Sequence, residues 1–367
     1  MSPSRRAEPL APYEYPKETR EQQSKVEYAN LEALDISKMK EPEGKAALAK
    51  QVLSFINTNA HTLSKGFFLV TGHGFSDEEI RRQYALCRDV FDLPLEERRQ
   101  FACDTAKGDF RGYKERANDK DIVEMYNIPK FTPEHERPHP QLVLDHIDGI
   151  RDFSRRIHDN LLLPLLRLLA YVLELDDEDF FVRRHRYEAE GLEYLRYMKY
   201  HPRSAEADAE VGNIWTAGHS DYNTLTFLFH QPVASLQVQT PEGQWRYVRS
   251  QPEAVVVNIA DALEFFSGGY LKSTIHRVVR PPPDQADKPR LSLIYFARPE
   301  ANVVLKPVSS PLLQRLGLQA QMETFTHDVT AEAWARARIA KDHKFRVGEV
   351  KTREGEIIAG VSQKFYD

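Results

Sequence analysis

Two spacings of apolar residues divide the chain into a mainly helical first half and a second half rich in strands. Apolar positions recur at helical spacing over residues 44–57, 76–101, 149–174 and 328–342. Such spacing is typical of helices that bury one face. Within the second segment, Asp92-Leu93-Pro94 marks a break and a restart. Residues 66–74 predict a short apolar strand that is closed by glycine turns.

From Tyr194 onward, short strand-like runs are separated by turn residues. They cover residues 195–200, 224–229, 236–239, 255–258 and 291–296. Regularly spaced short strands predict a β-sandwich or a jelly roll. We therefore expect one catalytic unit, in which helices pack around a β core and do not form a domain of their own.

Composition and charge narrow the class of partner. The formal net charge is −5 and the basic residues are dispersed, so the sequence predicts no binding of nucleic acid. No apolar run reaches the length that crosses a membrane, so no membrane partner is expected. Residues 1–6 lack the apolar segment of a secretory signal. These features predict a cytoplasmic protein in which Cys87 and Cys103 are free thiols.

The strongest chemical signal is a pair of imidazoles with one carboxylate. His219 and Asp221 lie two apart in an extended segment, so both side chains can reach one ion, and His276 follows the 255–258 strand. Two histidines and one carboxylate are the ligand set of non-haem Fe(II) oxygenases. A closed zinc site prefers ligands rich in thiolate, which the widely spaced Cys87 and Cys103 do not provide.

Two observations weaken the metal-site interpretation when the three residues are considered alone. A second His-x-Asp, His146 to Asp148, precedes a predicted helix, where residues two apart diverge, so we interpret both as surface or capping groups. Taken alone, His276 is better explained as a buried imidazole bonded to the backbone. Arg290 and Ser292 favour the metal hypothesis, since a guanidinium and a hydroxyl two apart on a strand form a carboxylate anchor. A structural salt bridge is the alternative for Arg290.

At this point the chain resembles the Fe(II)- and 2-oxoglutarate-dependent dioxygenases of the isopenicillin N synthase-like superfamily over roughly residues 28–310. The matching segments occur in the expected order. They are Gly66-Phe67-Phe68, His73-Gly74, Phe91-Asp92-Leu93-Pro94, Gly112-Tyr113, Leu236-Gln237-Val238, Gly243-Gln244-Trp245, Asp261-Ala262-Leu263-Glu264, His276-Arg277-Val278 and Arg290-Leu291-Ser292.

The resemblance implies a mainly β fold with flanking helices, built on a double-stranded β-helix (a cupin-like jelly roll). The implied regions are a poorly structured arm (1–28), a helical region (29–190), the jelly-roll core (191–310), and a helix with a tail (311–367). By the same resemblance, His219, Asp221 and His276 bind Fe(II), which 2-oxoglutarate chelates, and O2 takes the remaining position. Arg290 and Ser292 would bind the far carboxylate of 2-oxoglutarate.

The resemblance also suggests candidate contacts with the co-substrate and the substrate. His201 stands where the family often has a tyrosine that contacts 2-oxoglutarate, and it is a candidate to replace that donor. Phe296, Tyr113 and Tyr126 are candidate substrate contacts, with core packing as the alternative for each. Arg196 could bind an acidic substrate, with an interstrand ion pair as the alternative.

The expected function is oxidation of a C–H bond of a small organic molecule, in specialised metabolism, by hydroxylation, desaturation or cyclisation. It would consume 2-oxoglutarate and O2. One competing hypothesis is an iron oxidase of the same fold, in which Arg290 and Ser292 hold the carboxylate of the substrate itself. The other is a binding protein without activity. The sequence does not indicate the substrate or the oligomeric state.

Overall fold

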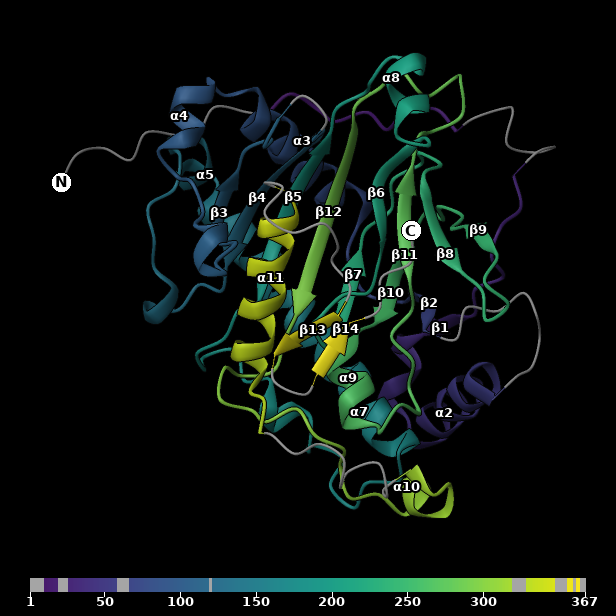
Figure 1. The fold of residues 1–367 in the computed structure, drawn as a ribbon. Coiled ribbons are helices and arrows are strands. Elements are labelled where there is room, and N and C mark those ends of the chain that lie inside the picture. Colours follow the sequence, from purple (N-terminus) through teal and green to yellow (C-terminus); the bar gives the residue numbers. More distant parts are fainter. Residues whose placement is uncertain are drawn as a thin grey trace.

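Two β-sheets enclose a central cavity, and helices cover the outside of the larger sheet (Figure 1). The computed structural model describes residues 10–18, 26–57, 66–118, 121–318, 328–346, 355–358 and 361–363. Within these residues, the sheets and their flanking helices confirm the predicted fold class of a jelly-roll core.

The larger sheet has eight strands. In spatial order they are β1 (Ala33–Asp35), β2 (Phe67–Thr71), β10 (Val255–Ile259), β7 (Leu225–Leu228), β12 (Arg290–Ala297), β5 (Tyr194–Tyr200), β4 (Val123–Pro129) and β3 (Gly112–Lys114). β1 and β2 are parallel, and every other pair in this sheet is antiparallel.

The smaller sheet has four antiparallel strands, which lie on one side of the molecule in Figure 1. In spatial order they are β6 (Ile214–His219), β11 (His276–Val279), β8 (Leu236–Gln239) and β9 (Trp245–Tyr247). β6 and β11 place His219 directly opposite His276. A third, two-stranded sheet near the C-terminus joins β13 (Gly355–Ile358) to β14 (Val361–Gln363).

The predicted helices are present, and local sequence explains where they end. α3 (Asp77–Asp92) begins at a capping box, in which Ser76 and Glu79 each bond the backbone N–H of the other. α4 (Leu95–Arg99) restarts directly after Pro94, as predicted. The remaining α-helices are α2 (Pro42–Asn57), α5 (Gln141–Asp145), α6 (Ile147–Ile157), α7 (Leu163–Val172), α8 (Ala205–Glu210), α9 (Asp261–Phe266), α10 (Pro311–Arg315) and α11 (Ala331–Arg346).

The helix predicted over 149–174 is α6 and α7 joined by a π-helical turn at His158–Leu162. Pro164 follows this turn and has no N–H to donate to the preceding turn, which accounts for the local widening. Short 3₁₀ helices occur at Ile36–Lys40, Thr105–Lys107, Pro133–His135 and Val182–Arg184.

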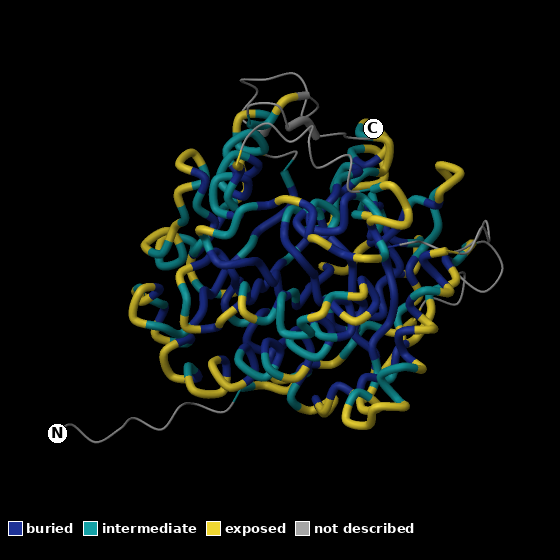
Figure 2. The backbone as a smooth tube through the Cα atoms, turned by 90° about the horizontal axis from the view of Figure 1, so that it is seen from below, coloured by how far each residue is buried: buried dark blue, intermediate teal, exposed yellow. Residues whose placement is uncertain are grey.

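The main hydrophobic core lies between the helices and one face of the larger sheet. Side chains of α2, α3, α6 and α7 pack there against alternate residues of the strands, among them Val70, Tyr197, Phe227, Val257 and Leu293. Figure 2 shows this buried centre surrounded by exposed loops. Because side chains alternate along a strand, the other face of the same sheet is left to line the cavity.

Residues 10–18 of the predicted N-terminal arm form no helix or strand, but they are held on α3. Tyr13 is buried and its ring stacks on Tyr84, with 5.2 Å between ring centroids. Arg88 donates hydrogen bonds to the backbone carbonyls of Ala11 and Pro12. Residues 1–9 and 19–25 of the arm lie outside the described residues.

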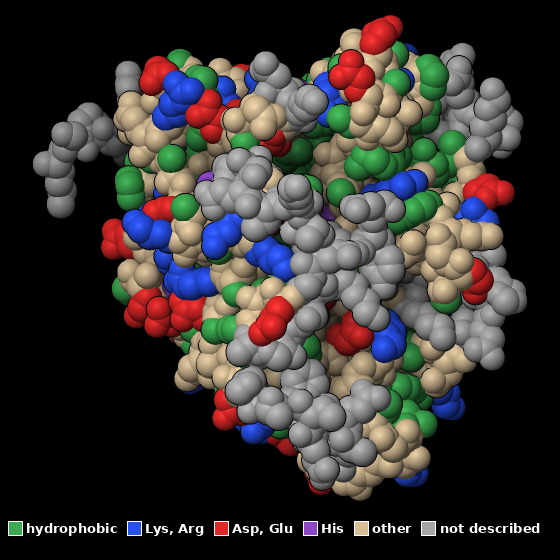
Figure 3. All heavy atoms as spheres, viewed as in Figure 1, with side chains coloured by type: hydrophobic (Ala, Val, Ile, Leu, Met, Phe, Trp, Pro, Cys, Tyr) green, Lys and Arg blue, Asp and Glu red, His purple; other side chains and the backbone are tan. Residues whose placement is uncertain are grey.

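None of the helices among the described residues combines the length and the apolar character that a membrane span requires. On the face drawn in Figure 3, acidic and basic side chains lie next to each other over the visible surface. Cys87 is buried and Cys103 is half-buried, and neither forms a disulfide within the described residues.

Candidate active site

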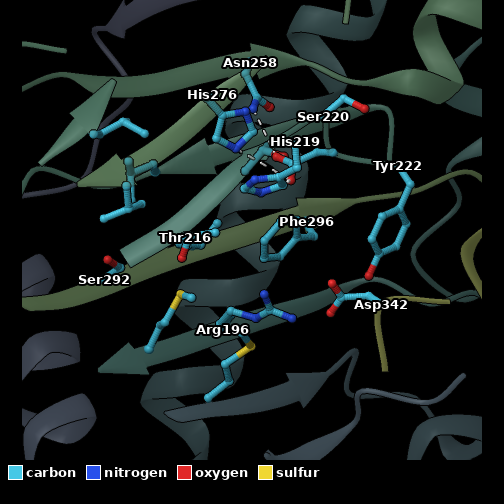
Figure 4. Close-up of a pocket in the computed structure, with 18 of the residues that line it drawn as sticks. Arg196, Thr216, His219, Ser220, Tyr222, Asn258, His276, Ser292, Phe296 and Asp342 are labelled. Atoms are coloured by element: carbon cyan, nitrogen blue, oxygen red, sulfur yellow. Dashed lines mark hydrogen bonds and ion pairs between the residues drawn. The ribbon is translucent and has the colours of Figure 1, made fainter. Parts of the chain in front are cut away.

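The structure brings His219, Asp221 and His276 together in the lining of the cavity. Figure 4 shows the rings of His219 and His276 side by side. His219 ends β6, His276 begins β11, and Asp221 follows β6 after one intervening residue. The Nε2 atoms of both histidines lie 3.9 Å from Oδ1 of Asp221. One potential ligand atom from each residue lies within 4.8 Å of the others, so the three side chains could hold one metal ion.

Backbone carbonyl groups set the orientation of both imidazoles. Nδ1 of His219 lies 2.9 Å from the carbonyl oxygen of Ala217, and Nδ1 of His276 lies 3.2 Å from that of Thr274. A carbonyl oxygen only accepts, so each Nδ1 carries the proton and each Nε2 keeps its lone pair. Both Nε2 atoms therefore present a lone pair on the side where Asp221 lies, as metal ligands require.

Two neutral donors orient the carboxylate of Asp221. Thr226 on β7 donates to Oδ2 at 2.6 Å, and Asn258 on β10 donates to the same oxygen at 3.0 Å. Burial alone would raise the pKa of Asp221, but His276, His219 and these two hydrogen bonds lower it to about 2. The carboxylate is therefore ionised at neutral pH, and Oδ1 is left to face the two imidazoles.

The cavity-facing side of the larger sheet continues from this cluster to a buried arginine. Arg290 and Ser292 on β12 lie opposite Tyr200 and Met198 on β5, and all four line the cavity. Nη1 of Arg290 donates to Oγ of Ser292 at 2.7 Å. Tyr200 lies beside the guanidinium, with its ring centroid 5.2 Å away.

Arg290 is 4% exposed and, in the described part of the chain, forms no ion pair with a carboxylate. Its Nε has no hydrogen-bond partner among these residues. Burial lowers the pKa of Arg290, because the charged form loses its hydration. A salt bridge with another described residue therefore does not explain this arginine, and the geometry fits a carboxylate supplied by a ligand.

Comparison with known proteins agrees with this arrangement. Residues 190–299 match the model of the 2OG-Fe(II) oxygenase superfamily, and residues 31–146 match that of the N-terminal region of the non-haem dioxygenases in morphine synthesis. A 2-oxoglutarate-dependent dioxygenase, frbH, of a Dothideomycetidae species is 31% identical over 78% of this chain and 87% of its own length. The chain belongs to the 2-oxoglutarate- and Fe(II)-dependent oxygenase superfamily.

Two further proteins are similar to this chain. A UPF0676 protein of Schizosaccharomyces pombe is 31% identical over 75% of this chain and 84% of its own length. A full-length Neurospora crassa protein solved with alpha-KG has a similar fold, with a TM-score of 0.71 and 24% identity, over 85% of this chain and 96% of that one. The same Neurospora crassa protein has also been solved with thymine. This oxygenase is therefore an oxidoreductase that uses Fe(II), 2-oxoglutarate and O2.

His201, the candidate contact with 2-oxoglutarate in this oxygenase, does not line the cavity. Nε2 of His201 lies 2.5 Å from a carboxylate oxygen of Glu124, which also contacts Arg98 and Tyr113. Strand alternation explains the outcome, because Tyr200 directly precedes His201 and is the residue of β5 that faces Arg290. Tyr200 was not predicted as a site residue, although it lies two and four residues after Met198 and Arg196 on β5 and therefore shares their face.

Of the three aromatic residues predicted to contact substrate, only Phe296 lines the cavity. Tyr113 and Tyr126 are each 1% exposed and belong to the main core on the helix side of the sheet. Oη of Tyr126 lies 2.6 Å from Nδ1 of His139, and Tyr113 donates to Glu124. The alternation of β4 accounts for this, since Met125 takes the cavity side and Tyr126 the opposite side.

The second His-x-Asp is not part of the site. His146 precedes the first residue of α6, but its side chain is buried and caps no backbone N–H of the helix, so the prediction of a surface or capping group was wrong for His146. Asp148 is exposed and pairs with Arg151 one turn later. The two residues are therefore separated from the cavity, whose described lining contains neither.

α11 contributes a wall of the cavity that the sequence pattern did not indicate. Arg338, Ile339, Lys341 and Asp342 of this helix line the cavity, and Figure 1 shows α11 in front of β12 and β5. Nη2 of Arg338 donates to the carbonyl oxygen of Ser220 at 2.9 Å, and its Nη1 pairs with Asp261. α11 is thereby attached to the residue between His219 and Asp221.

Proposed function

We propose that His219, Asp221 and His276 hold the Fe(II) of this oxygenase, and that Arg290 and Ser292 bind the far carboxylate of 2-oxoglutarate. Two histidines and an aspartate on one face of an ion leave positions open for reactants, as this chemistry requires. The observation that carries the proposal is the presence, in one cavity, of the histidine–aspartate cluster and a buried guanidinium that has no carboxylate partner among the described residues.

The chain's own residues prepare this site in three ways. The carbonyls of Ala217 and Thr274 keep the imidazoles in the tautomer that binds metal. Thr226 and Asn258 keep Oδ1 of Asp221 directed at the ion. Apolar side chains on both sheets exclude water from the space between the cluster and Arg290. These side chains are those of Phe67, Leu228, Leu236, Val256 and Val278.

The reactants then define the reaction class. With Fe(II) and 2-oxoglutarate bound, O2 supplies one oxygen atom to succinate, with release of CO2, and the other oxidises a C–H bond of the substrate. We propose a small organic molecule as that substrate, in specialised metabolism, with hydroxylation as the simplest outcome. Support comes from the enclosed cavity and from the Neurospora crassa structure, in which thymine is bound.

The test compares the two His-x-Asp pairs. Purified protein is loaded with Fe(II), supplied with 2-oxoglutarate and screened against candidate metabolites, while succinate and product masses are measured. We expect His219→Ala and Asp221→Ala to abolish succinate formation in a folded protein. His146→Ala and Asp148→Ala are the matched controls and should retain it.

Two results would contradict the proposal. Normal turnover by His219→Ala or Asp221→Ala would show that the cluster does not hold the metal. Oxidation of a metabolite without a matching amount of succinate would favour the same-fold oxidase, in which Arg290 binds the substrate.

A further inference from the structure

A second buried guanidinium, that of Arg196 on β5, also lines the cavity. Arg196 is 7% exposed, and its Nε and Nη2 donate to Oδ1 of Asn127 at 2.7 Å and to Oη of Tyr194 at 2.9 Å. Both acceptors are neutral groups. Throughout the described ranges, no carboxylate forms an ion pair with Arg196, contrary to the interstrand ion pair considered above.

Arg298 adds a second positive charge to the same group. It is 3% exposed, and its Nη2 donates to Oη of Tyr194 at 2.9 Å. Burial alone would raise the pKa of Tyr194, but Arg196 and Arg298 outweigh it and lower that pKa. The nearest acidic residues in sequence have other partners, since Glu193 pairs with Lys130 and Glu300 with Arg186. Arg196 and Arg298 therefore place two positive charges beside Tyr194, and neither forms an ion pair with a carboxylate of the described residues.

The residues around Arg196 indicate the shape of a bound molecule. Its guanidinium lies over the rings of Phe296 and Phe110, at 4.7 Å and 5.3 Å from their centroids, and both rings line the cavity. In Figure 4, Phe296 lies between the His219–His276 pair and Arg196. A molecule that lies along Phe296 would place one end near the candidate metal ligands and the other end at Arg196.

α11 brings one carboxylate to this part of the cavity. Its Asp342 lines the cavity on the same side of Phe296 as Arg196, but the two are not an ion pair. Lys341 of the same helix also lines the cavity. A buried guanidinium without a charged partner is costly, and the cost is offset when a ligand supplies the anion.

We propose that Arg196 is a specificity-determining residue that binds a carboxylate group of the substrate. The apolar, preferably aromatic, part of that substrate would then pack on Phe296, with a C–H bond near His219, Asp221 and His276. This inference rests on the proposed function, because it assumes that Arg290 is occupied by 2-oxoglutarate.

The test uses matched acids and amides. Benzoate, phenylacetate and 3-phenylpropanoate, each with its primary amide, are titrated by calorimetry into protein loaded with Mn(II) and saturating 2-oxoglutarate. Mn(II) replaces Fe(II) so that no turnover occurs, and 2-oxoglutarate keeps the probes away from Arg290. We expect at least one acid to bind about tenfold or more tightly than its amide, the difference that a charged hydrogen-bonded pair produces.

Variants assign that preference to Arg196. In Arg196→Met the acid and the amide should bind equally, with the Kd of 2-oxoglutarate unchanged, and Arg196→Lys should retain part of the preference. Lys199→Met is the control, since it removes a cation from the same strand on the opposite face, where Lys199 pairs with Asp92. Asp342→Asn should keep or strengthen the preference.

Three outcomes would overturn the proposal. They are amides that bind as tightly as the acids, a preference that survives in Arg196→Met, and no acid that binds to the loaded protein. Failure of the proposed function would look different, because Mn(II) and 2-oxoglutarate would then not bind. In that case the same titrations in an Arg290→Met background still test Arg196 alone.

Discussion

Thr226→Val tests whether the sheet behind the metal cluster controls metal binding. The hydroxyl of Thr226 accepts from Nδ2 of Asn223 at 2.8 Å and donates to Oδ2 of Asp221 at 2.6 Å. Valine has nearly the same shape, so the substitution removes the donor without opening a cavity. A hydrogen bond to a charged group is worth roughly 1.5–3 kcal/mol.

Only part of this free energy should appear as lost metal affinity, because Asn258 still donates to Oδ2 at 3.0 Å. Loss of a group that orients a metal ligand weakens binding by about 10- to 100-fold. We therefore expect the Kd of Fe(II) to rise about tenfold, near the lower end of that range. Anaerobic calorimetry with Fe(II) measures the change, and thermal unfolding shows whether the variant is folded.

Thr216→Val is the matched control for this experiment. Thr216 also lines the cavity, but its hydroxyl donates to Oη of Tyr200 at 3.3 Å and to none of the candidate ligands. Its Kd for Fe(II) should stay at the wild-type value. An unchanged Kd in folded Thr226→Val would show that Asp221 is not a ligand, or that Thr226 does not orient it.

Three further predictions test the remaining assignments. Arg290→Met should raise the Kd of 2-oxoglutarate by about 100-fold in calorimetry, without lowering the melting temperature, because an apolar side chain replaces a buried charge; an unchanged Kd would refute the anchor. Tyr126→Phe should cost about 1 kcal/mol of unfolding free energy through its lost bond to His139, with kcat unchanged, whereas a fall in kcat alone would restore a substrate role. Burial alone would raise the pKa of Glu124, but its partners, above all His201, outweigh burial and lower that pKa to about 2. The ionised carboxylate therefore stabilises the folded state at every pH above the pKa that Glu124 has in the unfolded chain. Glu124→Gln should therefore lose about 3 kcal/mol near pH 7, a deficit that shrinks as pH falls from about 5 to 2 in denaturant titrations, and a deficit independent of pH would contradict this.

The sequence was sufficient to predict which side chains act together when both lie on the same extended segment. Residues two apart on a strand share a face, so the pairs His219 with Asp221 and Arg290 with Ser292 could be expected to act together. The same rule, applied to β5 and β4, would have selected Tyr200 and Met125 and placed Tyr126 in the core. Tyr113 and Tyr126 were named as candidate substrate contacts without being assigned to a face of their strands, and their burial agrees with the core-packing alternative given for each.

Features that depend on the pairing of distant segments could not be read from the sequence. Thr226 and Asn258 orient Asp221 only because β7 and β10 are neighbours, with Asn258 directly opposite Thr226. The contact of α11 with the cavity depends on where a long connection returns the chain, which no local pattern specifies. The isolation of Arg196 from carboxylates likewise appears only when all its neighbours are placed.

The register of the larger sheet separates the two guanidinium groups in a way that permits two carboxylates to bind together. Arg196 lies opposite Ile294 on β12, and Arg290 lies four residues further along that strand, about 13 Å away at 3.3 Å per residue. At this distance two carboxylates repel each other by about 1 kcal/mol with an effective dielectric constant of 20. Each gains more than that from its own guanidinium.

Binding of 2-oxoglutarate and of a carboxylate probe should therefore be nearly independent. A repulsion of about 1 kcal/mol corresponds to a change in Kd of roughly fivefold, so each ligand should weaken the other by no more than this. Calorimetric titration of phenylacetate, with and without saturating 2-oxoglutarate, measures the effect in the Mn(II)-loaded protein. Strict competition would show that the cavity has one carboxylate site, at Arg290, because only a shared site makes the two ligands mutually exclusive.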